Sequence, residues 1–449
     1  MNKNLINKTK SKAPLGVWGV FFLFLLFSFS LTAQNPLTLE QSIEIALANN
    51  RNVRQQDLVR QTQEIAFNQA RQNLLPNLNA SAGQSFSFGR SLDNDNVYRS
   101  ANASQTQFGL SAGVILFDGL RLRNNIYMQR AEMHAAEADL ETIKADIMLN
   151  VTMVFLQVLM NKELLQIADE QLLLTQNKIE RQKSLIASGR LPEGELFDLQ
   201  AQEAREELNR VQADNNLKLS LLDLAQILEL DDFRDLSVVV PADLDPNALL
   251  LLSAETVFEN ALRSRPEIKS AEHRLRSSEK NVAIARSGFS PTLTLGGNFG
   301  SAYRTFTNFE NESFRSQMAY NLSTGVGLNL NVPIFNRFEV RNRVSTAQLN
   351  VESTRLAMEN TKLELRKVIE QAHQNALAAK TRWNATGRLE VAAREAYRFT
   401  NQRYENGRAT YYELFQAKNN LTQTLSEQTQ AKYEYIFRVK ILKILNEPI

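Results

Sequence analysis

The sequence predicts an α+β membrane protein in which four long strands and several very long helices form an internal two-fold repeat. Three observations support this fold class. Glycine-rich windows alternate apolar and polar residues with period two, and two long stretches almost lack glycine and proline. In addition, the second half of the chain repeats the first half at an offset of 215 to 218 residues.

The composition argues against nucleic acid binding, a metal centre and catalysis. The 449 residues have a formal net charge of +2 and no basic block with interleaved aromatic residues, so no nucleic acid partner is expected. There is no cysteine, and His134, His273 and His373 each stand alone in a helical-looking stretch, so no histidine-rich metal site is expected. No nucleophile elbow or phosphate-binding loop occurs, and we therefore expect neither an enzyme nor a cofactor.

Residues 1–33 have the pattern of a signal peptide. Four lysines precede an apolar run over 17–31, and the small residues Thr32 and Ala33 follow it, so cleavage is expected after Ala33. The run is short for a membrane span of about 20 residues, although a retained N-terminal anchor is the alternative. No later stretch looks long and apolar enough for a transmembrane helix. We expect an exported chain.

The offset divides the mature chain into two similar halves. Matching positions include Leu37 and Leu252, Glu40 and Glu255, Ala46 and Ala261, Gly189 and Gly407, Arg190 and Arg408, and Phe197 and Phe415. The expected organisation is a first repeat over 34–230, a linker over 231–251 and a second repeat over 252–449.

Strands are expected at about 78–89, 105–117, 292–306 and 320–333. In the last of these, even positions from 322 to 332 are apolar or threonine, while odd positions are asparagine, serine or glycine. This alternation gives one apolar face and one small, polar face. Each segment has the length of a tilted membrane-spanning strand, although a strand packed on a soluble core alternates in the same way.

Polar loops over 91–103 and 307–319 are expected to join the strands of each pair. Four strands cannot close a barrel, and open strand edges are not tolerated in lipid. We therefore expect the chain to oligomerise, and three copies would give a barrel of twelve strands.

Helices are expected at about 38–75, 119–188 and 192–230 in the first repeat. The second repeat should contain helices at about 253–287, 337–406 and 409–445. Residues 120–188 contain neither glycine nor proline, and such a helix would be about 100 Å long at ~1.5 Å per residue. Leu140, Ile143 and Ile147 follow spacings of three and four residues, which is typical of a coiled-coil seam.

With these features in this order, the sequence resembles the TolC-like trimeric outer membrane efflux proteins. The local signatures are Leu37–Val53, Ala66–Pro76, Leu116–Gly119, Pro333–Asn336 and the Gly-Arg turns at 189 and 407. The resemblance implies a homotrimer that shares one twelve-stranded barrel in outer membrane lipid and continues as a coiled-coil tunnel in the periplasm. Such a protein is a passive exit duct for efflux or type I secretion, working with an inner-membrane transporter and a periplasmic adaptor protein.

The resemblance also implies functional residues at the helix tips. The adaptor-docking tips would be Gly189, Arg190 and Leu191 with Gly407, Arg408 and Ala409, and the periplasmic aperture would include Glu195, Tyr404 and Glu413. The tip glycines and the two glutamates also have explanations that involve only local helix structure. A glycine is a common left-handed stop for a helix, and an acid near a helix N-terminus is stabilised by the macrodipole.

Two other functions remain open from the residues. A general outer membrane porin would use strands of this kind, but porins join their strands by short periplasmic turns rather than by very long helices. A periplasmic coiled-coil structural protein would use the helices and would leave the four alternating strands unexplained.

Overall fold

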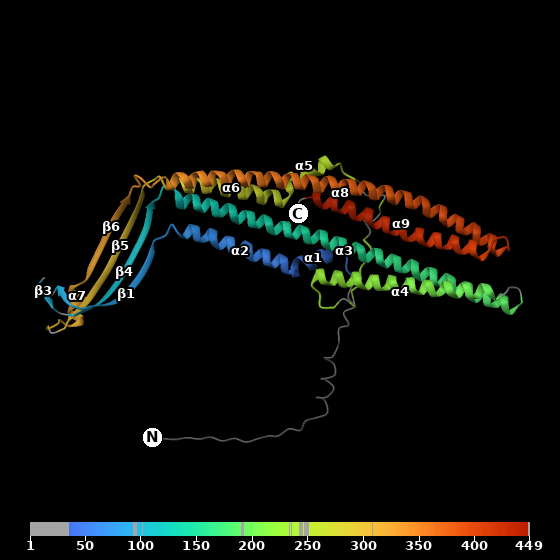
Figure 1. The fold of residues 1–449 in the computed structure, drawn as a ribbon, viewed down its shortest axis with the longest axis horizontal. Coiled ribbons are helices and arrows are strands. Elements are labelled where there is room, and N and C mark those ends of the chain that lie inside the picture. Colours follow the sequence, from blue (N-terminus) through green and yellow to red (C-terminus); the bar gives the residue numbers. More distant parts are fainter. Residues whose placement is uncertain are drawn as a thin grey trace, which may run out of the picture.

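The computed structural model describes residues 36–92, 97–100, 102–189, 193–232, 234, 236–241, 246, 251–307 and 309–447. The signal peptide expected over 1–33 lies outside these residues. The described part of the chain is a long rod with a β-sheet at one end and helices that run away from it (Figure 1).

Each half of the chain has two helices, then the strands with their connections, then two long helices. The helices are α1 (Leu39–Asn49), α2 (Arg51–Gln72), α3 (Arg121–Ala187), α4 (Gly194–Leu228), α5 (Ala254–Ser264), α6 (Pro266–Ser287), α7 (Phe314–Tyr320), α8 (Glu339–Glu405) and α9 (Tyr411–Asn446). The strands are β1 (Asn77–Ser87), β2 (Arg90–Leu92), β3 (Tyr98–Ser100), β4 (Ala103–Phe117), β5 (Thr292–Phe306) and β6 (Ser323–Asn331).

The main sheet has four antiparallel strands in the order β1-β4-β5-β6. Its register places the apolar residues of neighbouring strands side by side. Leu295 of β5 lies between Val114 of β4 and Leu328 of β6, and Leu110 of β4 pairs with Phe299 of β5. Because partners across a sheet point to the same side, one face is apolar and the other carries glycine, serine and asparagine. The apolar face is largely exposed in the single chain.

The connections between the strands contain secondary structure that the sequence analysis did not anticipate. The segment expected as a polar loop over 91–103 includes the short hairpin β2–β3, and the segment over 307–319 includes most of α7. The ring of Phe314 on α7 lies 5.2 Å from the ring of Tyr303, and the side chain of Gln317 accepts a hydrogen bond from the backbone nitrogen of Arg304 at 2.8 Å. Helix α7 therefore packs against β5.

Helices α3 and α8 each have 67 residues and run from the sheet to the far end of the rod (Figure 1). Helices α2 and α6 lie beside them near the sheet, and α4 and α9 lie beside them near the far end. Two segments expected as single helices are broken. Asn50 ends α1 and caps α2 with its side chain, and Arg265 takes an extended conformation before Pro266, as residues before proline prefer.

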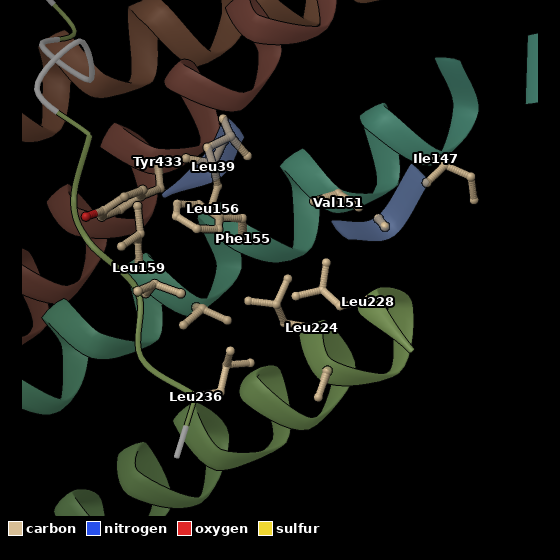
Figure 2. Close-up of a cluster of buried hydrophobic side chains, with 14 of the residues drawn as sticks. Leu39, Ile147, Val151, Phe155, Leu156, Leu159, Leu224, Leu228, Leu236 and Tyr433 are labelled. Carbon is tan, nitrogen blue, oxygen red and sulfur yellow. The ribbon is translucent and has the colours of Figure 1, made fainter. Parts of the chain in front are cut away.

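The main hydrophobic core lies at mid-length, where α1, α3, α4 and α9 meet (Figure 2). Val151 and Phe155 of α3 and Leu224 and Leu228 of α4 are fully buried there. Among the described helices, α3 alone contains a segment long and apolar enough to cross a membrane, contrary to our expectation, and 44% of that segment is buried. Part of the apolar surface of α3 is buried in this core.

The chain turns from strand to helix through left-handed backbone at two corners. Gly119 (φ 66°) and Leu120 (φ 65°) join β4 to α3, and Arg337 (φ 54°) and Phe338 (φ 63°) join β6 to α8. A Cβ atom at Gly119 would lie 2.5 Å from Cβ of Ser290, so glycine is required at that corner. Leu120, Arg337 and Phe338 adopt a conformation that non-glycine residues rarely take, which marks both corners as strained.

Candidate functional site

The far end of the rod consists of two helical hairpins, α3–α4 and α8–α9. Helix α8 ends in a Schellman motif: the Gly407 nitrogen donates to the Tyr404 carbonyl at 2.9 Å, and the Arg408 nitrogen donates to the Arg403 carbonyl at 2.7 Å. Gly407 has φ of 67° and Gly189 has φ of 71°, and a Cβ at either position would meet no atom within 4 Å. Backbone conformation, rather than lack of space, therefore requires glycine at both tips.

The residues expected at the tips are placed as follows. Gly189, Gly407 and Arg408 are exposed, and Ala409 is half-buried. Arg190 and Leu191 lie outside the described residues. Of the three exposed residues, Arg408 presents a side chain to the surroundings and the two glycines present backbone alone.

Tyr404 and Glu195, which the resemblance pairs, are in contact and join the two hairpins of one chain. The Tyr404 hydroxyl donates to Oε2 of Glu195 at 2.8 Å, and Nε2 of Gln182 donates to the same oxygen at 3.1 Å. Partial burial, together with this carboxylate, raises the pKa of Tyr404, so the phenol stays protonated and remains a donor. The Glu195 carboxylate faces the opposite hairpin, although the residue lies in the first turn of α4.

Glu413 has a different environment. It is the N3 residue of α9 in a capping box with Thr410, whose backbone nitrogen donates to Oε2 of Glu413 at 2.7 Å. This hydrogen bond lowers the pKa of Glu413, and Arg403 forms an ion pair with it at 3.4 Å. The local helix-capping explanation accounts for the geometry of Glu413, whereas the Glu195 contact needs the second hairpin.

A cavity of about 590 Å³ lies between the two hairpins behind these contacts. Glu195 and Tyr404 line it together with apolar residues from α4 and α9, including Leu199, Leu414 and Phe415. The Tyr404–Glu195 hydrogen bond is one of several polar links between the hairpins here, together with those from Lys178 to Tyr397 at 2.9 Å and from Arg181 to Glu405 at 3.2 Å.

Deeper in the hairpins lies a buried ion pair that the sequence analysis missed. Nζ of Lys418 on α9 lies 2.7 Å from Oε1 of Glu206 on α4, and both side chains are more than 90% buried. Lys418 also donates to the Thr175 hydroxyl of α3, and Gln202 donates to Glu206 at 2.7 Å. A signal was present, because Leu414, Lys418 and Leu421 follow the spacing of a buried seam, which placed Lys418 in an apolar stripe.

Within the described residues, no group of three or more histidine, aspartate or glutamate side chains is arranged to hold a metal ion. Each histidine stands alone in its own helix, but two of them meet in the folded chain. His134 on α3 and His273 on α6 lie side by side, with ring centroids 5.3 Å apart. Sequence spacing could not show this, because the two helices meet only in the folded chain.

Comparison with known proteins identifies a family, relatives and solved structures that this chain is similar to. The family model described as "Outer membrane efflux protein" matches residues 42–229 and 257–442. The chain is 22% identical to outer membrane protein TolC of Vibrio cholerae, over 84% of this chain and 83% of that protein. It is 27% identical to the pyoverdine export outer membrane protein OpmQ of Pseudomonas putida, over 76% and 69%. The crystal structure of outer membrane protein VceC from Vibrio cholerae superposes with a TM-score of 0.74 at 17% identity, covering 91% of this chain and 96% of that one.

The buried ion pair yields a stability prediction. Lys418→Ala should lower the free energy of unfolding by about 3–5 kcal/mol, because it leaves the Glu206 carboxylate buried without its cation. Circular dichroism of the purified protein would record this as a lower thermal midpoint. The matched control is Lys432→Ala, which breaks the half-exposed pair with Glu163 and should cost no more than about 1 kcal/mol.

Removing both charges with Lys418→Met and Glu206→Leu should restore most of the stability that the single variant loses. Equal midpoints for Lys418→Ala and the unaltered protein would show that the pair does not stabilise the tip.

Proposed function

The chain belongs to the outer membrane efflux protein family, and we propose that it works as a homotrimer in which three sheets close one twelve-stranded barrel. The protein is an outer membrane exit duct for efflux or secretion, with a helical tunnel in the periplasm. It is a channel rather than an enzyme.

The apolar face of the sheet is the observation that carries the barrel proposal. Val326, Leu328 and Leu330 of β6 are exposed by 80%, 66% and 61%, and they share their face with apolar residues of the other strands. An exposed apolar surface that spans four strands needs a covering, and lipid hydrocarbon is the covering proposed here. The second face, with glycine and asparagine, is suited to a water-filled lumen.

The free edges of the sheet support the trimer. Within the described residues, β1 and β6 each have one paired and one unpaired edge. In lipid, unpaired backbone groups cost several kcal/mol each, so β1 of one copy must pair with β6 of another. Three copies close the ring with twelve strands, a number that leaves an aqueous lumen. The family model matches the chain twice, which supports a duplicated design with repeats over 34–230 and 252–449.

The helix tips are proposed to face the periplasmic partners. Arg408 and the turns at Gly189 and Gly407 stand at the end most distant from the sheet, where an adaptor protein can reach them. Arg190, Leu191 and Ala409 complete the proposed docking tips. OpmQ is named for pyoverdine export, and the cation efflux system protein CusC of Escherichia coli, which is 24% identical over 90% of this chain and 84% of that protein, is named for a different cargo. We therefore assign the choice of cargo to the inner-membrane transporter that works with this duct.

The aperture is proposed to lie at the same tips, with the Tyr404–Glu195 hydrogen bond holding the two hairpins of each copy together in a closed state. Glu413 on each copy would place a ring of three carboxylates near the entrance and favour cations. A porin lacks long periplasmic helices, and a purely coiled-coil protein lacks the apolar sheet, so neither alternative accounts for both ends of the rod.

The barrel proposal predicts a difference between two adjacent positions on β6. Leu328→Arg places a charge on the lipid face and should destabilise the assembled protein by about 2–4 kcal/mol, whereas Asn329→Arg on the lumen face should be tolerated. Mass measurement in detergent should give a trimer for the unaltered protein and for Asn329→Arg. A monomer, or a protein that stays in solution without detergent, would end the barrel proposal.

The docking proposal predicts that a change at the tip lowers export without changing the amount of trimer. Gly407→Val forces a β-branched residue into left-handed backbone at a cost of about 1 kcal/mol or more, which shifts the tip. Barrel assembly, measured by trimer yield, should be unchanged while export by cells falls. Gly407→Asn is the matched control, because asparagine tolerates this conformation. Normal export by the valine variant would exclude this tip as the docking site.

The aperture proposal predicts that breaking the Tyr404–Glu195 contact opens the channel and raises its conductance. A hydrogen bond to a charged acceptor contributes about 1.5–3 kcal/mol, and threefold symmetry repeats it three times. Tyr404→Phe combined with Glu195→Ala should therefore raise single-channel conductance in planar bilayers without lowering trimer yield. Glu413→Gln is the control, since it should reduce cation preference and leave the closed state intact. Unchanged conductance in the double variant would show that other contacts hold the hairpins.

A further inference from the structure

Two of the three histidines in the chain meet where the first half of the rod packs against the second. His134 belongs to α3 and His273 to α6, their ring centroids are 5.3 Å apart, and the ring planes are inclined by 40°. Both side chains are half-buried, so the rings are held in place yet reachable from solvent. Neither histidine has a role in the barrel, the docking tips or the aperture.

We propose that His134 and His273 form a two-imidazole binding site for a divalent transition metal ion of the Cu²⁺, Ni²⁺ or Zn²⁺ class. The ring spacing fits such an ion. With a metal–nitrogen distance of about 2.0–2.1 Å and roughly 1.1 Å from nitrogen to ring centre, each centroid lies about 3.2 Å from the metal. Two such rings at a tetrahedral angle have centroids about 5.2 Å apart, close to the spacing found here.

Glu137 orients His134, one of the two proposed ligands. Its Oε2 lies 2.8 Å from Nδ1 of His134, one turn away on the same helix. A neutral imidazole that donates its Nδ1 hydrogen to a carboxylate keeps its Nε2 lone pair free, and metal-binding histidines are commonly oriented in this way. Glu137 is therefore assigned as a positioning residue rather than as a third ligand.

The helices that carry the two rings are fixed to each other beside the site. Oδ1 of Asp139 on α3 accepts a hydrogen bond from the Ser270 hydroxyl of α6 at 2.6 Å, and its Oδ2 pairs with Arg274 at 2.6 Å. Ser270 and Arg274 lie on either side of His273 along α6, and Asp139 follows His134 along α3. The ring spacing is thus set by the fold before an ion arrives, and preorganisation of this kind favours binding.

A hollow of about 450 Å³ next to the rings leaves room for an ion and its water ligands. Two basic residues, Arg60 and Lys269, and two acidic residues, Glu137 and Glu141, also line it, and the Arg60 guanidinium is paired with Asp57 at 2.7 Å and with Glu64 at 3.1 Å. With two imidazole nitrogens as its ligands, the site selects ions that prefer imidazole. Mg²⁺ and Ca²⁺ prefer six or more oxygen ligands, which two imidazoles do not supply, so they should bind more weakly than Cu²⁺.

The test uses the full-length protein in detergent, purified without a polyhistidine tag and stripped of metal. Titration with Cu²⁺ should give one bound ion per chain, and its electron paramagnetic resonance spectrum should show coupling to two imidazole nitrogens. His134→Gln and His273→Gln should each weaken binding at least tenfold. Glu137→Ala should weaken it by about 10- to 100-fold, the range found for residues that orient metal ligands.

The third histidine supplies the matched control. His373 lies on α8 and lines a different hollow, so His373→Gln should bind Cu²⁺ as tightly as the unaltered protein. The proposal is wrong if all three glutamine variants bind alike, if the unaltered protein shows only oxygen coordination, or if Mg²⁺ displaces Cu²⁺. Because the spectrum is recorded on the unaltered protein, the test stands even where a variant fails to fold.

Discussion

The burial of the apolar residues along α3 is the constraint on which the arrangement of the other helices depends. A helix of 67 residues cannot leave its apolar residues in water, and α3 contacts α2 and α6 near the sheet and α1, α4 and α9 beyond it. Its fully buried residues, such as Val151 and Phe155, lie at mid-length, where α1 and α4 complete the core (Figure 2). The position of α3 therefore links the sheet at one end to the hairpin tips at the other.

Much of the fold was predictable because it obeys two simple periodicities. Alternation with period two indicated the four long strands, and the absence of glycine and proline indicated the long helices. The helix breaks were harder. Pro266 was a visible sign of the break between α5 and α6, whereas at Asn50 the break depends on one side chain that caps α2. Helix α7 depends on aromatic contacts with β5 that no local pattern encodes.

The candidate site likewise contains contacts that the sequence predicted and contacts that it did not. The tip glycines were expected from local sequence, and the contact between Tyr404 and Glu195 came from the family resemblance. The Lys418–Glu206 pair and the His134–His273 pair each join helices that are distant in sequence. Local periodicity could place Lys418 in a buried stripe, but it could not show that Glu206 is its partner, nor that the two histidines meet, because each contact depends on which helices pack together.

The strand order has a consequence for how the chain acquires its structure. Strands β1 and β4 are near neighbours in sequence and can pair early, but β4 pairs with β5, so that Ala103 meets Phe306 about 200 residues later. Pairing over such a separation is intrinsically slow. Until β5 is available, the first hairpin exposes both an apolar face and an open edge, the features that lead to aggregation. The first half of the chain is therefore the part most exposed to aggregation until its second half is available to pair with it.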